Sequence, residues 1–247
     1  MRSQSVGFRV FRRIVRPPSD VVAGLAALET TIISDSMHRF GGMAANIRPA
    51  APEMRMAGPA ITVRVAPGDN LMVYEAFAVA LPGDVIVIES RGCTSVAQWG
   101  DLTSLAAKGL GLAGVVMDGS LRDLKGIGEV GFPVFAQPWI VPNGALKDGP
   151  GEVNVPVAVG GVPVLPGDVV LGDSHGVVVV PRLDAAVVLA QARAAAASDA
   201  RKAQEILAGK QIPDWLERTL RDKGCEIIDD TADERDGSVP REVGDGG

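Results

Sequence analysis

An arginine and an aspartate stand side by side at Arg122 and Asp123, a few residues after a short apolar run. Arginine can hold a carboxylate through paired, charge-assisted hydrogen bonds. A single aspartate can hold Mg²⁺ or Mn²⁺ when substrate and water oxygens complete the coordination shell. The pair therefore suits an acidic substrate that binds together with a divalent metal. The plainer alternatives are a surface ion pair and an acid that stabilises a helix N-terminus.

The residues around this pair predict where it lies. The apolar run from Gly114 to Met117 predicts a buried strand, and residues 121–130 can form a short helix. Arg122 and Asp123 are then expected on the rim of a sheet, where α/β folds bind small ligands. Asp118 is interpreted as structural, because Asp-Gly favours a turn and the aspartate side chain can tie down the loop.

A second candidate is the segment from Gln98 to Thr103, where a loop enters a helix predicted over residues 100–112. A helix N-terminus offers backbone N–H groups that favour anions. A glycine at position 100 would let a ligand approach the backbone closely. The alternative is a plain glycine turn in which Asp101 serves the helix dipole.

Composition narrows the class of protein. The 247 residues are 47% hydrophobic and 22% charged, which is typical of a globular protein with ample core. The net charge of −6 argues against a nucleic-acid partner. Only His38 and His175 are present, so a zinc site of several histidines is excluded and any metal should be oxygen-liganded. His175 lies in a predicted hairpin turn and is not expected to act as a base.

Two cysteines, Cys93 and Cys225, suggest no disulfide framework, so a reducing cytoplasm is the expected location. No apolar run approaches the roughly 20 residues of a membrane span, so no membrane partner is expected.

The predicted elements alternate between helix and strand at first and become strand-rich later. Helices are predicted over residues 19–29, 30–40, 70–80, 100–112 and 183–208. Asp69 and Asn70 are expected to cap the helix over residues 70–80. Strands are predicted over residues 60–65, 84–88, 114–117 and 134–135, with four or five more between 154 and 181. The tripeptide Pro-Gly-Asp at 67–69, 82–84 and 166–168 predicts type II turns. This pattern favours a layered α/β fold with helical N-terminal and C-terminal extensions.

We expect three parts along the chain. Residues 1–18 form a basic N-terminal arm, and residues 19–210 form a single domain. Residues 211–247 form a C-terminal extension, largely disordered and acidic at its end.

An ordered series of motifs resembles the family of regulator of ribonuclease activity A and 4-hydroxy-4-methyl-2-oxoglutarate aldolase. The resemblance covers roughly residues 20 to 210, and it is the order of the motifs that makes it specific. The motifs are Trp99–Leu102, Gly114–Asp123, Gly131–Phe135, Gly151–Pro156, Gly160–Val164, Pro166–Asp168 and Gly172–Pro181. The resemblance implies a swivelling β/β/α-type domain, assembled as a trimer or a dimer of trimers, with an active site at a subunit boundary.

The resemblance also implies roles for residues in the first two motifs. Arg122 and Asp123 would bind substrate and metal, the latter Mg²⁺ or Mn²⁺. Asp101 would orient metal-bound water. The turn at Gly100, with backbone amides near Leu102 and Thr103, would receive the pyruvyl carboxylate.

An acid from the neighbouring subunit's long C-terminal helix also belongs to the site in this family. Counting back from Gly209, which ends the helix, places Asp199 there, and Glu205 is the alternative.

The function implied is that of a divalent-metal-dependent class II pyruvate aldolase. It would cleave a 4-hydroxy-2-oxo acid of the 4-hydroxy-4-methyl-2-oxoglutarate or 4-carboxy-4-hydroxy-2-oxoadipate type, with oxaloacetate decarboxylation as a side activity. The alternatives are a non-catalytic regulatory protein of the ribonuclease-regulator type and another 2-oxo acid lyase or isomerase. The presence of Asp101, Arg122 and Asp123 favours an enzyme, because a binding module has no need for that set.

Overall fold

The computed structural model describes residues 5–137 and 140–228. The chain divides into two compact units, residues 1–199 and residues 200–247. The predicted acidic, disordered end of the chain falls largely outside the described residues.

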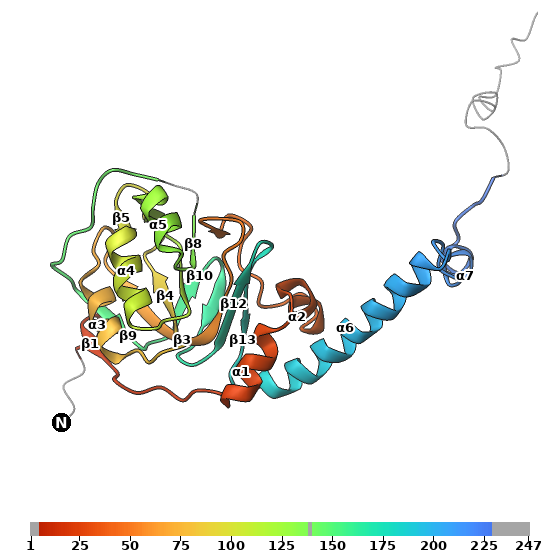
Figure 1. The fold of residues 1–247 in the computed structure, drawn as a ribbon, viewed down its shortest axis with the longest axis horizontal. Helices are drawn as coiled ribbons and strands as arrows, with labels where there is room; N and C mark the ends of the chain where they lie inside the picture. The colour runs from red at the N-terminus through yellow and green to blue at the C-terminus, as the bar shows by residue number, and fades with distance from the viewer. Residues whose placement is uncertain (1–4, 138–139, 229–247) are drawn as a thin grey trace, which may run out of the picture. The chain divides into compact units, whose positions relative to one another are not determined.

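A mixed sheet forms the centre of the first unit (Figure 1). Its central strands run parallel; in spatial order they are β3 (Met56–Val65), β4 (Val85–Glu89), β6 (Gly114–Met117) and β8 (Val134–Ala136). Successive strands are joined by helices; these are α3 (Leu71–Val79), α4 (Asp101–Gly109) and α5 (Leu124–Val130). Each connection is therefore a βαβ crossover, and the carboxyl ends of β4 and β6 lie at the same edge of the sheet.

Strand β3 joins two parts of the sheet. Its residues 56–59 pair with β12 (Val169–Asp173), whereas residues 60–64 pair with β4. Strand β12 turns directly into β13 (Gly176–Val180), which confirms the hairpin predicted around His175. A further hairpin joins β10 (Val157–Val159) to β11 (Val162–Val164), so the stretch predicted to hold four or five strands holds four.

Short strands extend the sheet at both edges. Strand β9 (Gly151–Val153) lies antiparallel to β3, and β1 (Arg9–Val10) lies parallel to β9. At the other edge, β2 (Arg48–Pro49) lies antiparallel to β8. None of these strands was predicted from the sequence, because two or three residues are too few to show a periodicity.

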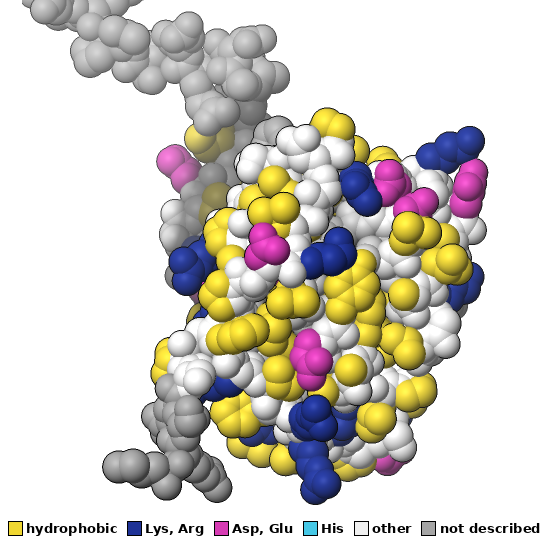
Figure 2. Space-filling model, turned by 90° about the vertical axis from the view of Figure 1, so that its left-hand side faces the viewer, with side chains coloured by type: hydrophobic (Ala, Val, Ile, Leu, Met, Phe, Trp, Pro, Cys, Tyr) yellow, Lys and Arg dark blue, Asp and Glu magenta, His cyan; other side chains and the backbone are white. Residues whose placement is uncertain are grey.

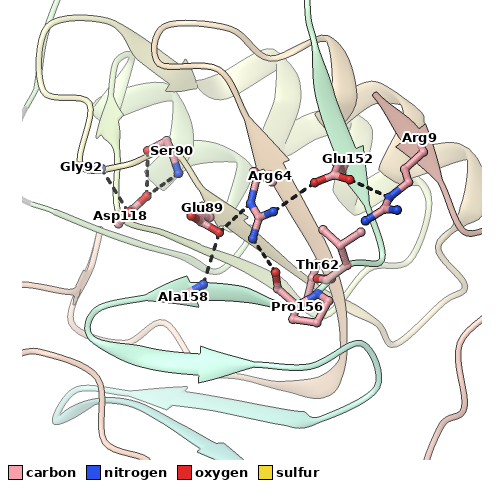
Figure 3. A network of polar contacts seen from close by, with 11 residues as sticks. Arg9, Thr62, Arg64, Glu89, Ser90, Gly92, Asp118, Glu152, Pro156 and Ala158 are labelled. Carbon is pink, nitrogen blue, oxygen red and sulfur yellow. Dashed lines mark hydrogen bonds and ion pairs between the residues drawn. The ribbon is translucent and has the colours of Figure 1, made fainter. Parts of the chain in front are cut away.

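A network of charged side chains connects the N-terminal arm to the sheet (Figure 3). Arg64 of β3 pairs with Glu89 at 3.1 Å and with Glu152 at 3.0 Å. It also donates to the carbonyl oxygen of Pro156 at 2.7 Å. Arg9 pairs with the second oxygen of Glu152 at 2.7 Å. Because Glu152 is buried, one carboxylate holds β1, β3 and β9 together.

The apolar side chains form two clusters. The larger one lies around β3, β4, β6 and β8 and includes residues of α3 and α5. The smaller one packs α1 (Ser19–Ala26), α2 (Thr30–Ser36) and the first turns of α6 (Ala185–Leu207) against β12 and β13. Strands β4 and β6 are apolar along nearly their whole length because both faces of the sheet are covered.

All three Pro-Gly-Asp segments form the predicted type II turns. In each, the glycine has a positive φ, of 80° at Gly68, 88° at Gly83 and 89° at Gly167. In each, the aspartate N–H donates at 3.0 Å to the carbonyl oxygen three residues earlier; the donors are Asp69, Asp84 and Asp168.

The second unit contains the end of α6 and a short helix, α7 (Leu216–Asp222). Its side chains form local ion pairs, Lys210–Asp214 at 2.6 Å and Arg221–Glu217 at 2.9 Å. Among the residues that the structure describes, no helix combines the length and apolar character that crossing a bilayer requires.

Asp173 links α2 to the β12–β13 hairpin. Its carboxylate accepts hydrogen bonds from Thr30 N at 2.8 Å, Thr30 Oγ1 at 2.7 Å and His175 N at 2.9 Å. Burial alone would raise the pKa of Asp173, but the hydrogen bonds from Thr30 and His175 hold that pKa below its ordinary value.

We predict that Asp173→Ala lowers the free energy of unfolding by about 2–4 kcal/mol near neutral pH, because buried donors lose their acceptor. A depressed native pKa stabilises the fold above the unfolded pKa of about 4, and this stabilisation is lost as the pH falls through the native value. The difference between wild type and variant should therefore shrink in acid. Urea unfolding across pH measures it, with the exposed Asp35→Ala as control. A pH-independent difference would contradict this account.

Candidate active site

Two short strands bring the predicted site residues together. Strand β5 (Ala97–Trp99), which follows β4, pairs in parallel with β7 (Ser120–Leu121), which follows β6. The N–H of Arg122 donates to the carbonyl oxygen of Trp99 at 3.1 Å. Because both strands run in the same direction, the residues that follow each of them lie side by side.

Trp99 anchors the turn that enters α4. Its indole is 1% exposed and stacks on Phe132 with ring centroids 6.0 Å apart. Trp99 Nε1 donates to Ser104 Oγ at 2.8 Å, and Ser104 Oγ donates to the carbonyl oxygen of Gly100 at 2.9 Å. The first turn of the helix is thus fixed by buried groups that lie behind the site.

Arg122 and Asp123 form an ion pair, with Nε and Oδ2 3.1 Å apart and the side chains 45% and 40% exposed. Asp123 has a φ of 57°, a left-handed conformation that is uncommon outside glycine. It occupies the N-cap position of α5 without a side-chain capping bond, and the helix begins at Leu124 rather than at the predicted Leu121. Residues held in such conformations cluster at functional sites, where surrounding structure enforces the strain.

Two glycines leave room for this pair. A Cβ atom at Gly100 would lie 2.7 Å from Asp123 Oδ2. A Cβ atom at Gly144 would overlap Arg122 Nη1. Both positions therefore need glycine because a charged side chain passes directly over the backbone.

The predicted site residues within this chain line one cavity of about 290 Å³. They are Gly100, Asp101, Leu102, Thr103, Arg122 and Asp123. This volume lies at the lower end of the range for small-molecule pockets, about 300–1,000 Å³, so it suits a small metabolite. Four larger cavities, of about 300 to 550 Å³, are lined by none of these six residues. Asp199, which was predicted to act from a neighbouring subunit, lies on α6 and does not line the cavity.

The first turn of α4 already uses some of its hydrogen-bonding groups. The N–H of Leu102 donates to Asp101 Oδ1 at 2.6 Å. The N–H of Gly100 donates to Thr103 Oγ1 at 2.8 Å. A substrate carboxylate that binds the Leu102 amide must therefore displace the Asp101 side chain.

Asn70, Tyr74 and Lys147 also line the cavity and were not singled out from the sequence. Asn70 was predicted to cap α3 together with Asp69, but its side chain makes no capping bond. Asp69 supplies that bond instead, accepting from Leu71 N at 2.8 Å. Lys147 lies in a loop without a recognisable motif, so nothing in the local sequence marks it.

Asp118 is structural, as predicted (Figure 3). Its Oδ1 accepts hydrogen bonds from the N–H and hydroxyl of Ser90 at 2.6 and 2.8 Å. Its Oδ2 accepts from the N–H of Gly92 at 3.1 Å. The carboxylate thereby fixes the start of the loop that leads from β4 to β5.

The donor set fits a hard divalent ion. Asp101 and Asp123 are the two acids that line the cavity, and Arg122 and Lys147 are its two cations. Within residues 5–137 and 140–228, no group of three or more His, Cys, Asp or Glu side chains is placed to hold a metal. Mg²⁺ and Mn²⁺ accept one or two carboxylates when substrate and water supply the other oxygens, whereas a structural zinc site would need more protein ligands.

Residues 30–179 match the RraA-like family, described as aldolase/RraA. A Halalkalibacterium halodurans protein provisionally named 4-hydroxy-4-methyl-2-oxoglutarate aldolase is 38% identical over 187 residues, which are 76% of this chain and 89% of that protein. The 4-hydroxy-4-methyl-2-oxoglutarate aldolase of Thermus thermophilus is 35% identical over 127 residues, which are 51% of this chain and 76% of that protein.

A solved structure of the RNA-processing inhibitor RraA from Thermus thermophilus resembles this chain with a TM-score of 0.57 and 31% identity. The match covers 62% of this chain and 92% of that one. The likeness confirms the α/β fold predicted from the sequence.

Two carboxylates of this region, Asp118 and Asp101, should differ in how much their removal lowers the free energy of unfolding. We predict that Asp118→Ala lowers the free energy of unfolding by about 2–4 kcal/mol, because three donors lose their acceptor. Asp101→Ala should cost less than about 1 kcal/mol, since within the described residues the Asp101 side chain accepts a hydrogen bond only from the N–H of Leu102 and otherwise acts on the helix dipole. Chemical denaturation of both variants tests this difference. Equal losses would show that Asp101 supports the fold.

Proposed function

The chain belongs to the RraA-like family of aldolases and RraA proteins, and from this premise we propose that it is a divalent-metal-dependent class II pyruvate aldolase. Its substrate would be a 4-hydroxy-2-oxo acid of the 4-hydroxy-4-methyl-2-oxoglutarate or 4-carboxy-4-hydroxy-2-oxoadipate type, and pyruvate would be one product. The observation that carries the proposal is the meeting of Arg122, Asp123 and Asp101 in one small cavity.

Arg122 would bind the oxo-acid half of the substrate. Its Nε pairs with Asp123, which leaves the other guanidinium N–H groups for a carboxylate or keto oxygen. Negative charge grows on those oxygens during cleavage, so a fixed cation stabilises the transition state more than the substrate. Asp123 would hold the metal, and a bound Mg²⁺ would supply Lewis-acid stabilisation of the same charge.

Cleavage requires a base for the hydroxyl on C4. Asp101 lines the cavity and would accept that proton through a water molecule. Loss of the proton forms a carbonyl at C4 and breaks the C3–C4 bond. The bonding pair becomes the enolate of pyruvate, and return of a proton to C3 gives pyruvate. Oxaloacetate decarboxylation needs no such base: the C3–C4 bond breaks with release of CO₂, and the bonding pair forms the same enolate.

A second copy of the chain would complete the site. Several apolar side chains on the segments that form the cavity are exposed, which is unusual around a polar site. They include Leu102, Leu105 and Leu146. Figure 2 shows hydrophobic side chains gathered between scattered charged ones on the side of the molecule where α3 and β1 lie. Apolar patches of this kind mark protein interfaces. We propose a trimer or a dimer of trimers in which Asp199 or Glu205 of a neighbour reaches the site.

The second candidate function is that of a non-catalytic regulator. It is favoured by the likeness to a structure described as an RNA-processing inhibitor. Such a protein would show no EDTA-sensitive turnover of oxaloacetate and would capture a macromolecular partner in a pulldown. An aldolase would show the turnover.

We predict that Arg122→Ala lowers kcat/KM for both aldol cleavage and oxaloacetate decarboxylation by a factor of about 10²–10³, the usual effect of removing one donor to a developing oxyanion. Arg122→Lys should recover only part of the activity, because lysine keeps the charge but loses the planar fork. Steady-state assays with added Mg²⁺ measure both reactions. Undiminished turnover in the alanine variant would show that Arg122 has no catalytic role and would contradict the proposal.

We predict that Asp123→Asn weakens Mn²⁺ binding at least ~10-fold, because a carboxylate ligand is replaced by a neutral amide. Electron paramagnetic resonance of free Mn²⁺ measures the affinity without reference to activity. Glu129→Gln is the matched control, since Glu129 is an acid on the adjacent helix that does not line the cavity. Unchanged Mn²⁺ affinity in the Asp123 variant would place the metal elsewhere.

A further inference from the structure

The N-terminal arm forms one wall of a second cavity, which shares no lining residue with the candidate active site. This cavity has a volume of about 480 Å³. Three arginines line it: Arg9 and Arg13 of the arm, and Arg182, which follows β13. In the described part of the chain, no acidic side chain lines it. An anion is therefore the kind of ligand that would balance the charge of this cavity.

Hydrogen bonds hold the arm in place beside the cavity. The N–H of Phe11 donates to a carbonyl oxygen of β9 at 3.1 Å, and Asn154 Nδ2 donates to the carbonyl oxygen of Phe11 at 2.7 Å. Further along the arm, Arg16 donates to both carboxylate oxygens of Asp84, at 2.8 and 2.6 Å. The arm is thus attached on both sides of Arg13, so this wall of the cavity is formed before any ligand binds.

The three arginines differ in how far their charges are already compensated. Arg9 pairs with the buried Glu152 at 2.7 Å (Figure 3). Arg182 Nη1 donates to a carbonyl oxygen in the turn before β12 at 3.2 Å. Among the residues that the structure describes, no carboxylate forms an ion pair with Arg13 or Arg182. These two guanidinium groups therefore have N–H donors available for a ligand.

The rest of the lining shows what kind of body the anion carries. Apart from the arginines and Asn154, the cavity is lined by apolar residues, among them Phe11, Val155 and Leu165. Asn154 is 7% exposed, so little of its side chain can reach a ligand. No serine, threonine, glutamine or acidic residue of the described ranges lines the cavity. A sugar or a nucleobase would therefore find few side-chain partners for its hydroxyl and amino groups, whereas an apolar body needs none.

We propose that this cavity binds an organic anion with an apolar body, such as an aromatic or aliphatic carboxylate. Arg13 and Arg182 hold the carboxylate through charge-assisted hydrogen bonds, which the planar guanidinium group can make in pairs. The apolar body lies against Val155 and Leu165. Because the cavity is separate from the one around Arg122, this proposal does not depend on the aldolase function.

The chemistry of the ligand is tested with three probes in isothermal titration calorimetry of the full chain. 2-Naphthoate carries both a carboxylate and a ring system, 2-naphthalenemethanol has the ring system without the charge, and acetate has the charge without the ring system. The Kd of naphthoate should be at least ~10-fold lower than that of either comparison probe, because both the charged hydrogen bonds and the burial of apolar surface contribute. Equal Kd values for naphthoate and either comparison probe, or no binding of naphthoate, would overturn the proposal.

The location of the site is tested by substitutions in the arm. Arg13→Met should raise the Kd of naphthoate roughly 10-fold, and Arg13→Lys should raise it less, because lysine keeps the charge and loses the planar fork. Arg12→Met is the matched control, since Arg12 is the adjacent exposed arginine and does not line the cavity. An equal rise in the Arg12 and Arg13 variants would indicate a general attraction to the basic arm and would contradict a built site.

Arg122→Ala separates this cavity from the candidate active site, where a carboxylate could also bind. The Kd of naphthoate should be unchanged in this variant. A rise there, with no rise in Arg13→Met, would place the probe beside Arg122 and overturn the proposal. Failure of the aldolase proposal would show itself in turnover alone and would leave these Kd values as expected.

Discussion

The candidate site depends on the short parallel pairing of β5 with β7. Strands β4 and β6 end as neighbours in the sheet, but their carboxyl ends alone would not bring the two halves of the site into contact. Asp118 fixes the loop after β4, and the N–H of Arg122 donates a hydrogen bond to the carbonyl oxygen of Trp99 at 3.1 Å. This pairing sets the Gly100 backbone so close to Asp123 that a Cβ atom there would lie 2.7 Å from the carboxylate. A side chain at position 100 would separate the two halves, so the geometry and the glycine require each other.

The charges of the cavity explain why an acid and a cation would bind together. Two acids and two basic side chains line the cavity, so it has no large net charge of its own. A dicarboxylate alone would bring excess negative charge, and a divalent ion alone would bring excess positive charge. Bound together, the two ligands keep each charge close to an opposite one. This matters because an unpaired charge removed from water is costly.

The sequence predicted those features that arise from local rules. The apolar runs at β4 and β6 marked buried strands, the Pro-Gly-Asp segments marked type II turns, and Asp118-Gly119 marked a tied loop. It did not predict β5 or β7, because strands of two or three residues carry no periodic signal and form only where their partner is already placed. Asn70 was assigned to a helix cap because Asp and Asn are both good caps. Only the structure shows that Asp69 makes this bond, while Asn70 Nδ2 donates to the carbonyl oxygen of Gln98. Lys147 reaches the site through a loop distant in sequence, which no local pattern reveals.

The groups that build this region differ from the groups that could act in it. Trp99 and Asp118 make several buried bonds, and the fold around the cavity rests on them. Three other side chains add little to the stability of the fold, because their contacts are local and they are partly exposed. They are Asp101, Asp123 and Lys147. A scaffold of this kind could serve a regulator without any of the three, because function resides in the site and not in the fold. Their occurrence in one cavity, together with the left-handed backbone of Asp123, therefore calls for a ligand rather than a structural explanation.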